Sequence, residues 1–183
     1  MRLLAFAASL RRDSLNRKLL RVAVEVARAA GTDMDVAEFA EFDMPLYNAD
    51  AQAASGFPPG AQALAARVLA ADGMMIVSPE YNFSMPGTLK NAIDWVSRMR
   101  PVPFRGKHAL LLAASGAMAG GIRGLWQLRI PLEGNGVLVY PDMYALSQAD
   151  TAFTPDGQLA DAGALARLRA MIEAYLAMAE KLR

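Results

Sequence analysis

Two short segments of the sequence hold polar side chains in an order that predicts ligand binding. The first brings Ser9, Arg11, Ser14 and Asn16 together directly before a stretch of helical period. Because the start of a helix leaves backbone N–H groups free and carries a partial positive charge, an anion is stabilised there. The hydroxyl, amide and guanidinium groups add further donors. This segment therefore predicts a site for a phosphomonoester that needs no metal.

The alternative for this first segment is a helix cap beside a solvated surface. Ser14 would then only cap the helix, and the basic side chains Arg11, Arg12, Arg17, Lys18 and Arg21 would form an exposed face. The position of the segment at a strand-to-helix turn favours the phosphate interpretation. The sequence contains neither a Walker loop nor the GxGxxG of dinucleotide folds, which argues against NTP hydrolysis and tightly bound NAD.

The second segment, from Ser78 to Gly87, places aromatic and polar residues between two prolines. Pro79 fixes one backbone dihedral and Pro86 suits a helix start, so we expect a stiff loop. Such a loop can stack on a planar ring, such as a flavin, and bind its edge through backbone N–H groups. The alternative is a rigid turn with Tyr81 and Phe83 in the core or in a subunit contact. Glu80 is expected to hold loop geometry or a subunit contact, with proton donation a minor role.

Five short apolar runs alternate with segments of helical period, which predicts the elements that position these loops. The runs are Leu3–Ala8, Met34–Phe39, Met74–Val77, Ala109–Ala114 and Val137–Tyr140. Four of them are nearly all apolar, as in parallel strands that are buried on both faces. The helical stripes begin at Leu15, Leu64, Leu89 and Leu165. This alternation predicts a small, doubly wound α/β fold.

In such a fold a ligand binds beyond the carboxyl ends of the strands. The loops expected there are Ser9–Asn16, Ser78–Ser84 and Ser115–Gly121. The connection from Met44 to Gly60 is interrupted by Pro and Gly, and either an ordinary long loop or a wall of a substrate site is consistent with it.

Composition excludes several classes of protein. The 183 residues carry 19 Lys plus Arg and 18 Asp plus Glu, a net charge of +1 that gives no basic footprint for nucleic acid. The absence of Cys and the single His exclude disulfides, thiolate metal sites, multi-histidine metal centres and a cysteine nucleophile. No apolar run reaches the roughly 18 residues that span a bilayer. We therefore expect one soluble, cytoplasmic domain over residues 1–183, without a bound metal.

Both segments resemble the signature segments of the NADPH-dependent FMN reductase family, in particular its quinone and chromate reductase branch. The matching stretches are Ser-Leu-Arg-Arg-Asp-Ser-Leu-Asn (9–16) and Ser-Pro-Glu-Tyr-Asn-Phe-Ser-Met-Pro-Gly-Thr-Leu-Lys-Asn-Ala-Ile-Asp-Trp (78–95). The similarity continues through Pro45-Leu46-Tyr47, Gly106-Lys107 and the loop from Ala114 to Gly121, so it covers most of the chain in the same order. The second segment is long and specific.

The resemblance implies a flavodoxin-like, doubly wound five-stranded parallel sheet in the order 2-1-3-4-5, with helices on both faces. It also implies FMN as cofactor, NADPH or NADH as co-substrate, and transfer of two electrons to quinones, chromate or other small acceptors. No protein residue would be catalytic, because the flavin carries the chemistry. The residues implied to bind FMN are Ser9, Arg11, Ser14, Leu15 and Asn16 at the phosphate, Pro79, Glu80, Tyr81, Asn82 and Phe83 at the ring, and Ser115 from the fourth strand.

Two positions depart from the family pattern. Ala8 stands where the family commonly has Gly, which narrows the freedom of that turn, and Phe83 occupies a variable position. The resemblance also implies a homodimer or homotetramer. Arg123 and Trp126 are either interface anchors or part of an ordinary amphipathic helix with Trp126 in the core, and Arg123 meeting the NADPH phosphate is a third possibility. His108 is expected to be structural or exposed.

Two other functions were weighed against the oxidoreductase. A flavodoxin-like carrier would hold FMN and serve a protein partner, but the net charge of +1 lacks the acidity that such a carrier uses to meet basic partners. A receiver-like module would need an acidic cluster at the strand ends, where Ser9 and Ser78-Pro79 stand instead. The sequence does not identify the acceptor or the preferred nicotinamide.

Overall fold

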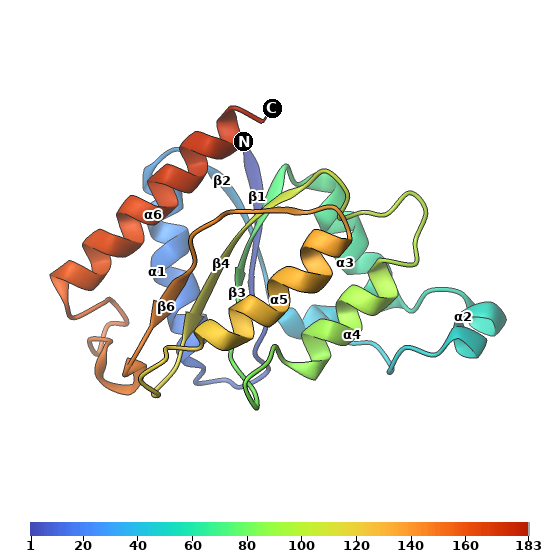
Figure 1. Cartoon of the computed structure of the whole chain (residues 1–183), viewed down its shortest axis with the longest axis horizontal. Helices are drawn as coiled ribbons and strands as arrows, with labels where there is room; N and C mark the ends of the chain where they lie inside the picture. Colours follow the sequence, from blue (N-terminus) through green and yellow to red (C-terminus); the bar gives the residue numbers. More distant parts are fainter. Residues whose placement is uncertain (183) are drawn as a thin grey trace.

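The computed structural model describes residues 1–182 and has a parallel sheet between two layers of helices (Figure 1). The strands are β1 Arg2–Ala7, β2 Asp33–Ala37, β3 Gly73–Val77, β4 His108–Ala114, β5 Leu138–Val139 and β6 Tyr144–Leu146. The sheet order is β2-β1-β3-β4-β5, with β6 also paired to β4. This is the order 2-1-3-4-5 expected for a flavodoxin-like fold.

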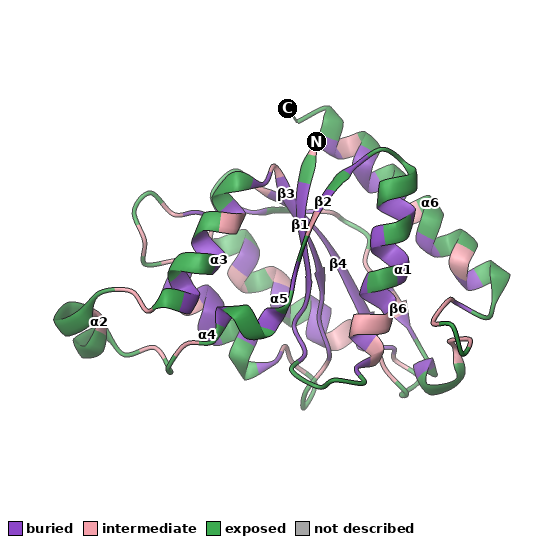
Figure 2. Ribbon diagram, turned by 180° about the vertical axis from the view of Figure 1, so that it is seen from behind, coloured by how far each residue is buried: buried purple, intermediate pink, exposed green. Residues whose placement is uncertain are grey.

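The helices are α1 Leu15–Ala29, α2 Ala49–Ser55, α3 Pro59–Ala70, α4 Gly87–Val96, α5 Ile122–Gly134 and α6 Ala162–Glu180, with 3₁₀ turns at Phe39–Phe42 and Ala149–Thr151. One face of the sheet packs against α1 and α6, and the other against α3, α4 and α5 (Figures 1 and 2). Every residue of β3 and β4 is buried, because these central strands are covered on both faces. None of the described helices is long and apolar enough to cross a bilayer.

Two predicted strands end differently from the expectation. The second ends at Ala37 rather than Phe39, because Phe39 begins a 3₁₀ turn and its ring stacks on Phe6 with centroids 5.7 Å apart. The fifth ends at Val139 rather than Tyr140, and the chain then adds β6, a sixth strand beyond the five expected; both β5 and β6 pair with β4. The segment between them contains Pro141, which has no N–H group to donate to a neighbouring strand.

The connection from Met44 to Gly60 is more structured than a plain loop. It contains α2, whose described residues are all at least partly exposed, and α3 begins within it at Pro59. The side chain of Asn48 caps α2 by accepting the N–H groups of Asp50 and Ala51.

His108 is buried at the opposite end of the sheet from the predicted loops, which confirms the structural role expected for it. Its side chain is only 5% exposed, and Nδ1 lies 2.7 Å from the Tyr175 hydroxyl. The same hydroxyl lies 3.2 Å from the Met74 carbonyl oxygen, so the Tyr175 hydroxyl joins His108 to the neighbouring strand β3. Nε2 is buried without a partner among the described residues. Burial lowers the pKa of His108. The negative charge of Asp72 acts in the opposite direction and raises it, while the positive charge of Lys107 lowers it further.

The lowered pKa of His108 predicts a pH dependence of stability. The histidine is neutral in the fold but binds a proton in the unfolded chain below its ordinary pKa of 6.5, so its contribution is present above pH 6.5 and is lost as the pH falls below that value. Urea unfolding between pH 8 and pH 5 should show a steeper acid loss for the wild type than for His108→Gln. The difference in slope is at most about 1.4 kcal/mol per pH unit, the value for one proton. Equal slopes in the two proteins would contradict the lowered pKa of His108.

Candidate functional site

The three predicted loops emerge side by side at one edge of the sheet. Residue Ala7 of β1 is in register with Val77 of β3, and Val77 is in register with Leu112 of β4. Just past the strand ends, the Ser78 N–H donates to Leu112 at 2.8 Å and the Ser115 N–H donates to Leu146 at 3.0 Å. The loops after β1, β3 and β4 therefore form one rim, at the lower edge of the sheet in Figure 1.

The first loop, residues 9–14, leaves a row of backbone donors free. Within residues 1–182, the N–H groups of Leu10, Arg11, Arg12 and Asp13 donate to no other group, and the Arg11 guanidinium has no partner. Ser14 caps α1, since its hydroxyl accepts the Asn16 N–H at 3.2 Å. Ser14 therefore does cap the helix, and the loop still offers N–H groups that can donate to an anion.

The side chains of Leu15 and Asn16 point away from this row of donors. The Asn16 amide group donates to the Ala114 carbonyl and its oxygen accepts the Ala114 N–H, both at 2.9 Å. Leu15 packs against the core beneath α1. Asn16 therefore fixes the first loop to the end of β4, next to Ser115, which the sequence did not indicate.

The second loop closes in a tight turn from Tyr81 to Ser84. Their backbones exchange two hydrogen bonds of 2.9 and 3.0 Å, and Asn82 and Phe83 adopt the left-handed conformation with φ of 49° and 63°. The stiff loop expected from the two prolines is present. Tyr81 and Phe83 are 48% and 67% exposed, so the alternative that they pack in the core is wrong.

The Glu80 carboxylate joins this turn to the start of α5. It accepts the backbone N–H groups of Arg123 at 3.0 Å and Gly124 at 3.1 Å, and binds the Arg123 guanidinium at 2.8 Å through Nε and 2.6 Å through Nη2. The same guanidinium lies over the Phe83 ring, 4.5 Å from its centroid. Glu80 therefore holds loop geometry, one of the roles expected for it, and it does so inside one chain.

The start of α5 lies close beneath the second loop because of a glycine. A Cβ at Gly124 would lie 3.1 Å from both the Glu80 Cα and the Ser84 carbonyl oxygen, tighter than ordinary packing allows. The small residue lets the helix N-terminus approach the carboxylate, where its partial positive charge stabilises the anion. In the sequence, Arg123-Gly124 after Gly120-Gly121 is the feature that makes this contact. Its partner Glu80 is 43 residues away, so the sequence does not show that they meet.

Ser115 begins the third loop. Its hydroxyl accepts the Ala117 N–H at 3.2 Å, which turns the chain sharply after β4. The N–H groups of Gly116 and Met118 have no acceptor among the described residues. This loop therefore adds free donors beside the second loop.

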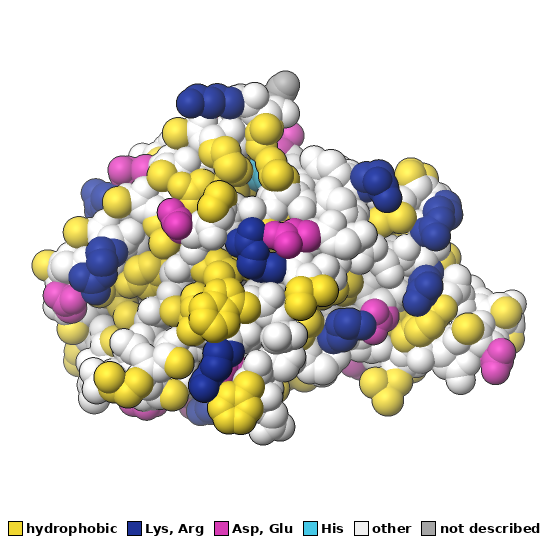
Figure 3. Space-filling model, viewed as in Figure 1, with side chains coloured by type: hydrophobic (Ala, Val, Ile, Leu, Met, Phe, Trp, Pro, Cys, Tyr) yellow, Lys and Arg dark blue, Asp and Glu magenta, His cyan; other side chains and the backbone are white. Residues whose placement is uncertain are grey.

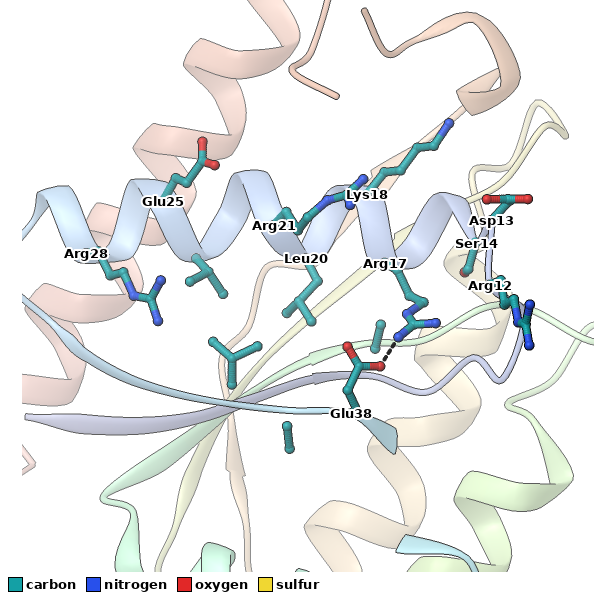
Figure 4. A pocket seen from close by; sticks show the side chains of 14 residues that line it. Arg12, Asp13, Ser14, Arg17, Lys18, Leu20, Arg21, Glu25, Arg28 and Glu38 are labelled. Carbon is teal, nitrogen blue, oxygen red and sulfur yellow. Dashed lines mark hydrogen bonds and ion pairs between the residues drawn. The ribbon is translucent and has the colours of Figure 1, made fainter. Parts of the chain in front are cut away.

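A separate hollow of about 490 Å³ lies between α1 and the edge strand β2 (Figure 4). It touches the first loop at Arg12, Asp13 and Ser14, but no residue of the second or third loop lines it. Arg17 is paired there with Glu38, and Arg28 donates to the Met34 carbonyl. The hollow is thus a charged groove along the side of the sheet, apart from the rim where the three loops meet.

Comparison with known proteins assigns this arrangement to a family. Residues 1–151 match the NADPH-dependent FMN reductases. The chain belongs to this family. A quinone reductase of Escherichia coli K12 is 35% identical over 184 residues, which cover 96% of this chain and 93% of the relative. An NAD(P)H-dependent FMN reductase of Pseudomonas aeruginosa is 35% identical over 190 residues, which cover 100% and 97%.

Solved structures agree with this assignment. The flavoenzyme FerB of Paracoccus denitrificans, an NAD(P)H:(acceptor) oxidoreductase, matches with a TM-score of 0.85 and 30% identity over 98% of this chain and 97% of its own. Oxidised flavodoxin 1 of Bacillus cereus matches with a TM-score of 0.62 at 12% identity over 96% of this chain and 97% of its own, which bears on the fold alone. The resemblance seen in the sequence and the flavodoxin-like fold are both confirmed.

Removing the Glu80 carboxylate should loosen the second loop. Glu80→Ala leaves the Arg123 and Gly124 N–H groups without an acceptor and frees the Arg123 guanidinium, so we expect unfolding by urea to become easier by about 1–3 kcal/mol. Glu133→Ala, which breaks the more exposed Arg129–Glu133 pair on the same helix, is the control and should cost about 0.5 kcal/mol or less. Equal losses of unfolding free energy in the two variants would mean that the Glu80 contacts stabilise the fold no more than an exposed ion pair does.

Proposed function

We propose that this protein is an FMN-dependent NAD(P)H:acceptor oxidoreductase that reduces quinones and similar small acceptors, including chromate. The observation that carries the proposal is the joining, at one rim, of a loop with free anion donors and a rigid turn with exposed aromatic rings. Family membership supplies the cofactor and reaction class. A nicotinamide-dependent reductase works where NAD(P)H is available, so the proposal includes a cytoplasmic location.

The first loop fits the phosphate of FMN. Ser9, Arg11 and Ser14 stand beside the unpaired N–H groups of residues 10–13, and a charged fork with several amides is the donor set that a phosphomonoester needs. In this proposal Leu15 and Asn16 contribute through position: Leu15 anchors the first turn of α1, and Asn16 fixes that turn to β4.

The second and third loops fit the planar ring. Tyr81 and Phe83 expose their rings, and the N–H groups of Asn82 and Phe83 have no acceptor in the described chain. Pro79 and Glu80 keep this turn in place, and Ser115 closes the site from β4. Donors that are fixed before reduction stabilise the negative charge that develops on a reduced ring.

Bound FMN supplies hydride chemistry, and the protein supplies binding, orientation and electrostatics. The proposed cycle is ping-pong: NAD(P)H and then the acceptor occupy the same exposed place. This cycle needs no protein nucleophile, in keeping with a sequence that has no Cys and one His, the latter buried away from the rim.

The test is an anaerobic titration of the purified protein loaded with FMN. The yellow protein should bleach with NADPH or NADH and recover its colour with a quinone. A protein that binds FMN but is not reduced by either nicotinamide would favour the electron carrier instead. A folded protein that binds no FMN would overturn both functions.

A substitution of Arg11 tests the proposed phosphate site directly. Arg11→Ala should weaken FMN binding about tenfold or more, as expected for loss of a charge-assisted hydrogen bond, while binding of riboflavin, which has no phosphate, stays the same. Arg169→Ala, an exposed residue of α6 away from the loops, is the control and should leave both affinities unchanged. Calorimetry measures both ligands, and equal losses for FMN and riboflavin would reject the assignment.

We further propose that the protein assembles as a homodimer or homotetramer through the outer face of α5. Trp126 and Ile130 lie one turn apart on this helix and are 54% and 65% exposed, so the alternative of Trp126 in the core is wrong. Figure 3 shows hydrophobic side chains gathered over this face of the molecule. An exposed apolar group with a nearby Arg is typical of a protein interface.

Trp126→Ala should therefore lower the mass of the assembly measured by light scattering, with little change in the unfolding of the subunit. Leu69→Ala removes a side chain of similar exposure, 56%, from α3 and is the matched control. A variant that keeps its mass but loses stability would instead show that Trp126 supports the fold of its own subunit.

A further inference from the structure

A fourth segment of the chain reaches the rim after β6 and brings a carboxylate that the sequence did not indicate. β6 pairs in parallel with the end of β4, with Leu146 opposite Ala114, so the chain after β6 leaves the sheet at the same edge as the third loop. It forms the 3₁₀ turn Ala149–Thr151, whose middle residue is Asp150. This turn therefore meets the third loop, which begins at Ser115.

Two backbone hydrogen bonds hold this turn against the third loop. The Ala149 N–H donates to the Ser115 carbonyl at 3.0 Å, and the Gln148 N–H donates to the Ala117 carbonyl at 3.5 Å. The two acceptors stand on either side of Gly116 in the sequence, so the turn spans that glycine. The main chain therefore fixes the place of this turn independently of its side chains.

Gly116 leaves the space in which the Asp150 side chain lies. A Cβ at residue 116 would overlap the Asp150 Oδ2 atom and would lie 2.9 Å from Cγ of the same carboxylate. The carboxylate thus occupies a place that any other residue would fill with its own side chain. The N–H groups of Gly116 and Met118 have no acceptor among the described residues. A negative charge is therefore next to free donors of the proposed ring site.

The charge of Asp150 is not neutralised by a contact within the described chain. Over residues 1–182 its carboxylate oxygens accept no hydrogen bond and form no ion pair, and the residue is exposed. Glu80 of the second loop differs, because Arg123 and two backbone N–H groups bind its carboxylate. Asp13 of the first loop directly follows two arginines in the sequence. Asp150 thus adds an unpaired negative charge beside the third loop.

We propose that Asp150 lowers the reduction potential of bound FMN, so that the reduced protein passes its electrons on readily. The inference rests on the proposed function and assigns a new residue to it. NAD(P)H delivers a hydride, which brings two electrons and one negative charge to the ring, and the acceptor later removes the same two electrons. Free N–H donors stabilise the added charge, whereas a carboxylate raises its free energy. Asp150 thus limits how strongly the site favours the reduced form.

Removing and then reversing this charge tests the proposal in the FMN-loaded protein. Asp150→Asn keeps the shape of the side chain, and Asp150→Lys replaces the negative charge by a positive one. We expect the ratio of the affinities for reduced and oxidised FMN to rise about threefold in the first variant and about tenfold in the second, since solvent screens an exposed charge and keeps its effect small. For a two-electron couple these factors equal upward shifts of the midpoint potential of about 14 and 30 mV. Anaerobic equilibration with a reference dye measures the potential.

Asp50→Asn is the matched control, because it removes an exposed carboxylate from α2, on the opposite side of the molecule in Figure 1. It should leave the potential unchanged. An unchanged or lowered potential in the Asp150 variants, or a rise that Asp50→Asn reproduces, would overturn the proposal. A merely structural role would lower the free energy of unfolding by urea without the stepwise response to charge, and would overturn it too. A wild type that binds no FMN would instead overturn the proposed function.

The place of the carboxylate is tested through Gly116. Gly116→Ala puts a methyl group where the carboxylate lies, so the flexible Asp150 side chain must turn away while it keeps its charge. In that background Asp150→Asn should change the affinity ratio by less than about 1.5-fold, compared with about threefold in the wild type. The comparison holds even if Gly116→Ala weakens FMN binding, because both proteins carry it. A threefold change in both backgrounds would mean that the charge acts from elsewhere, and would overturn its assignment to the third loop.

Discussion

The site depends on the hydrogen-bonded register of three neighbouring parallel strands. Because β1, β3 and β4 run in the same direction and are paired nearly residue for residue, their loops leave the sheet at the same edge. Loops that are about 70 and 30 residues apart in the chain thus become neighbours. Free donors from the first loop and exposed rings from the second lie at one rim for this reason. Without that register, neither loop alone offers more than a helix start or a tight turn.

Two polar contacts, one buried and one partly buried, then hold the loops where the strands leave them. Asn16 binds both backbone groups of Ala114, and Glu80 binds the first turn of α5 together with Arg123. Asn16 ties the start of α1 to the end of β4, and Glu80 ties the loop after β3 to α5, the helix after β4. Loops fixed in this way keep their free N–H groups in place. Such groups suit a bound ring whose charge changes on reduction, because they need no rearrangement when the charge appears. The left-handed turn at Asn82 and Phe83 is closed by the two Tyr81–Ser84 backbone hydrogen bonds, and the Arg123 guanidinium lies over the Phe83 ring.

Charge is distributed unevenly around the rim. Basic residues line the groove between α1 and β2, whereas a smaller hollow beside Leu10 and Thr88 has aromatic walls and one carboxylate. The two hollows flank the first loop from different sides.

The sequence by itself determined the fold class, the strand positions near the rim and the two loops, because hydrophobic period and turn residues are local signals. It also led to the family through the segments at 9–16 and 78–95. Only the tertiary structure decided the extent of the second strand, the presence of the sixth, the partners of Asn16 and Glu80, and the exposure of Trp126. Each of these depends on groups that are distant in the chain and meet only when the sheet is assembled. No local sequence pattern predicts such a contact, because its free energy depends on both residues and on the fold that brings them together.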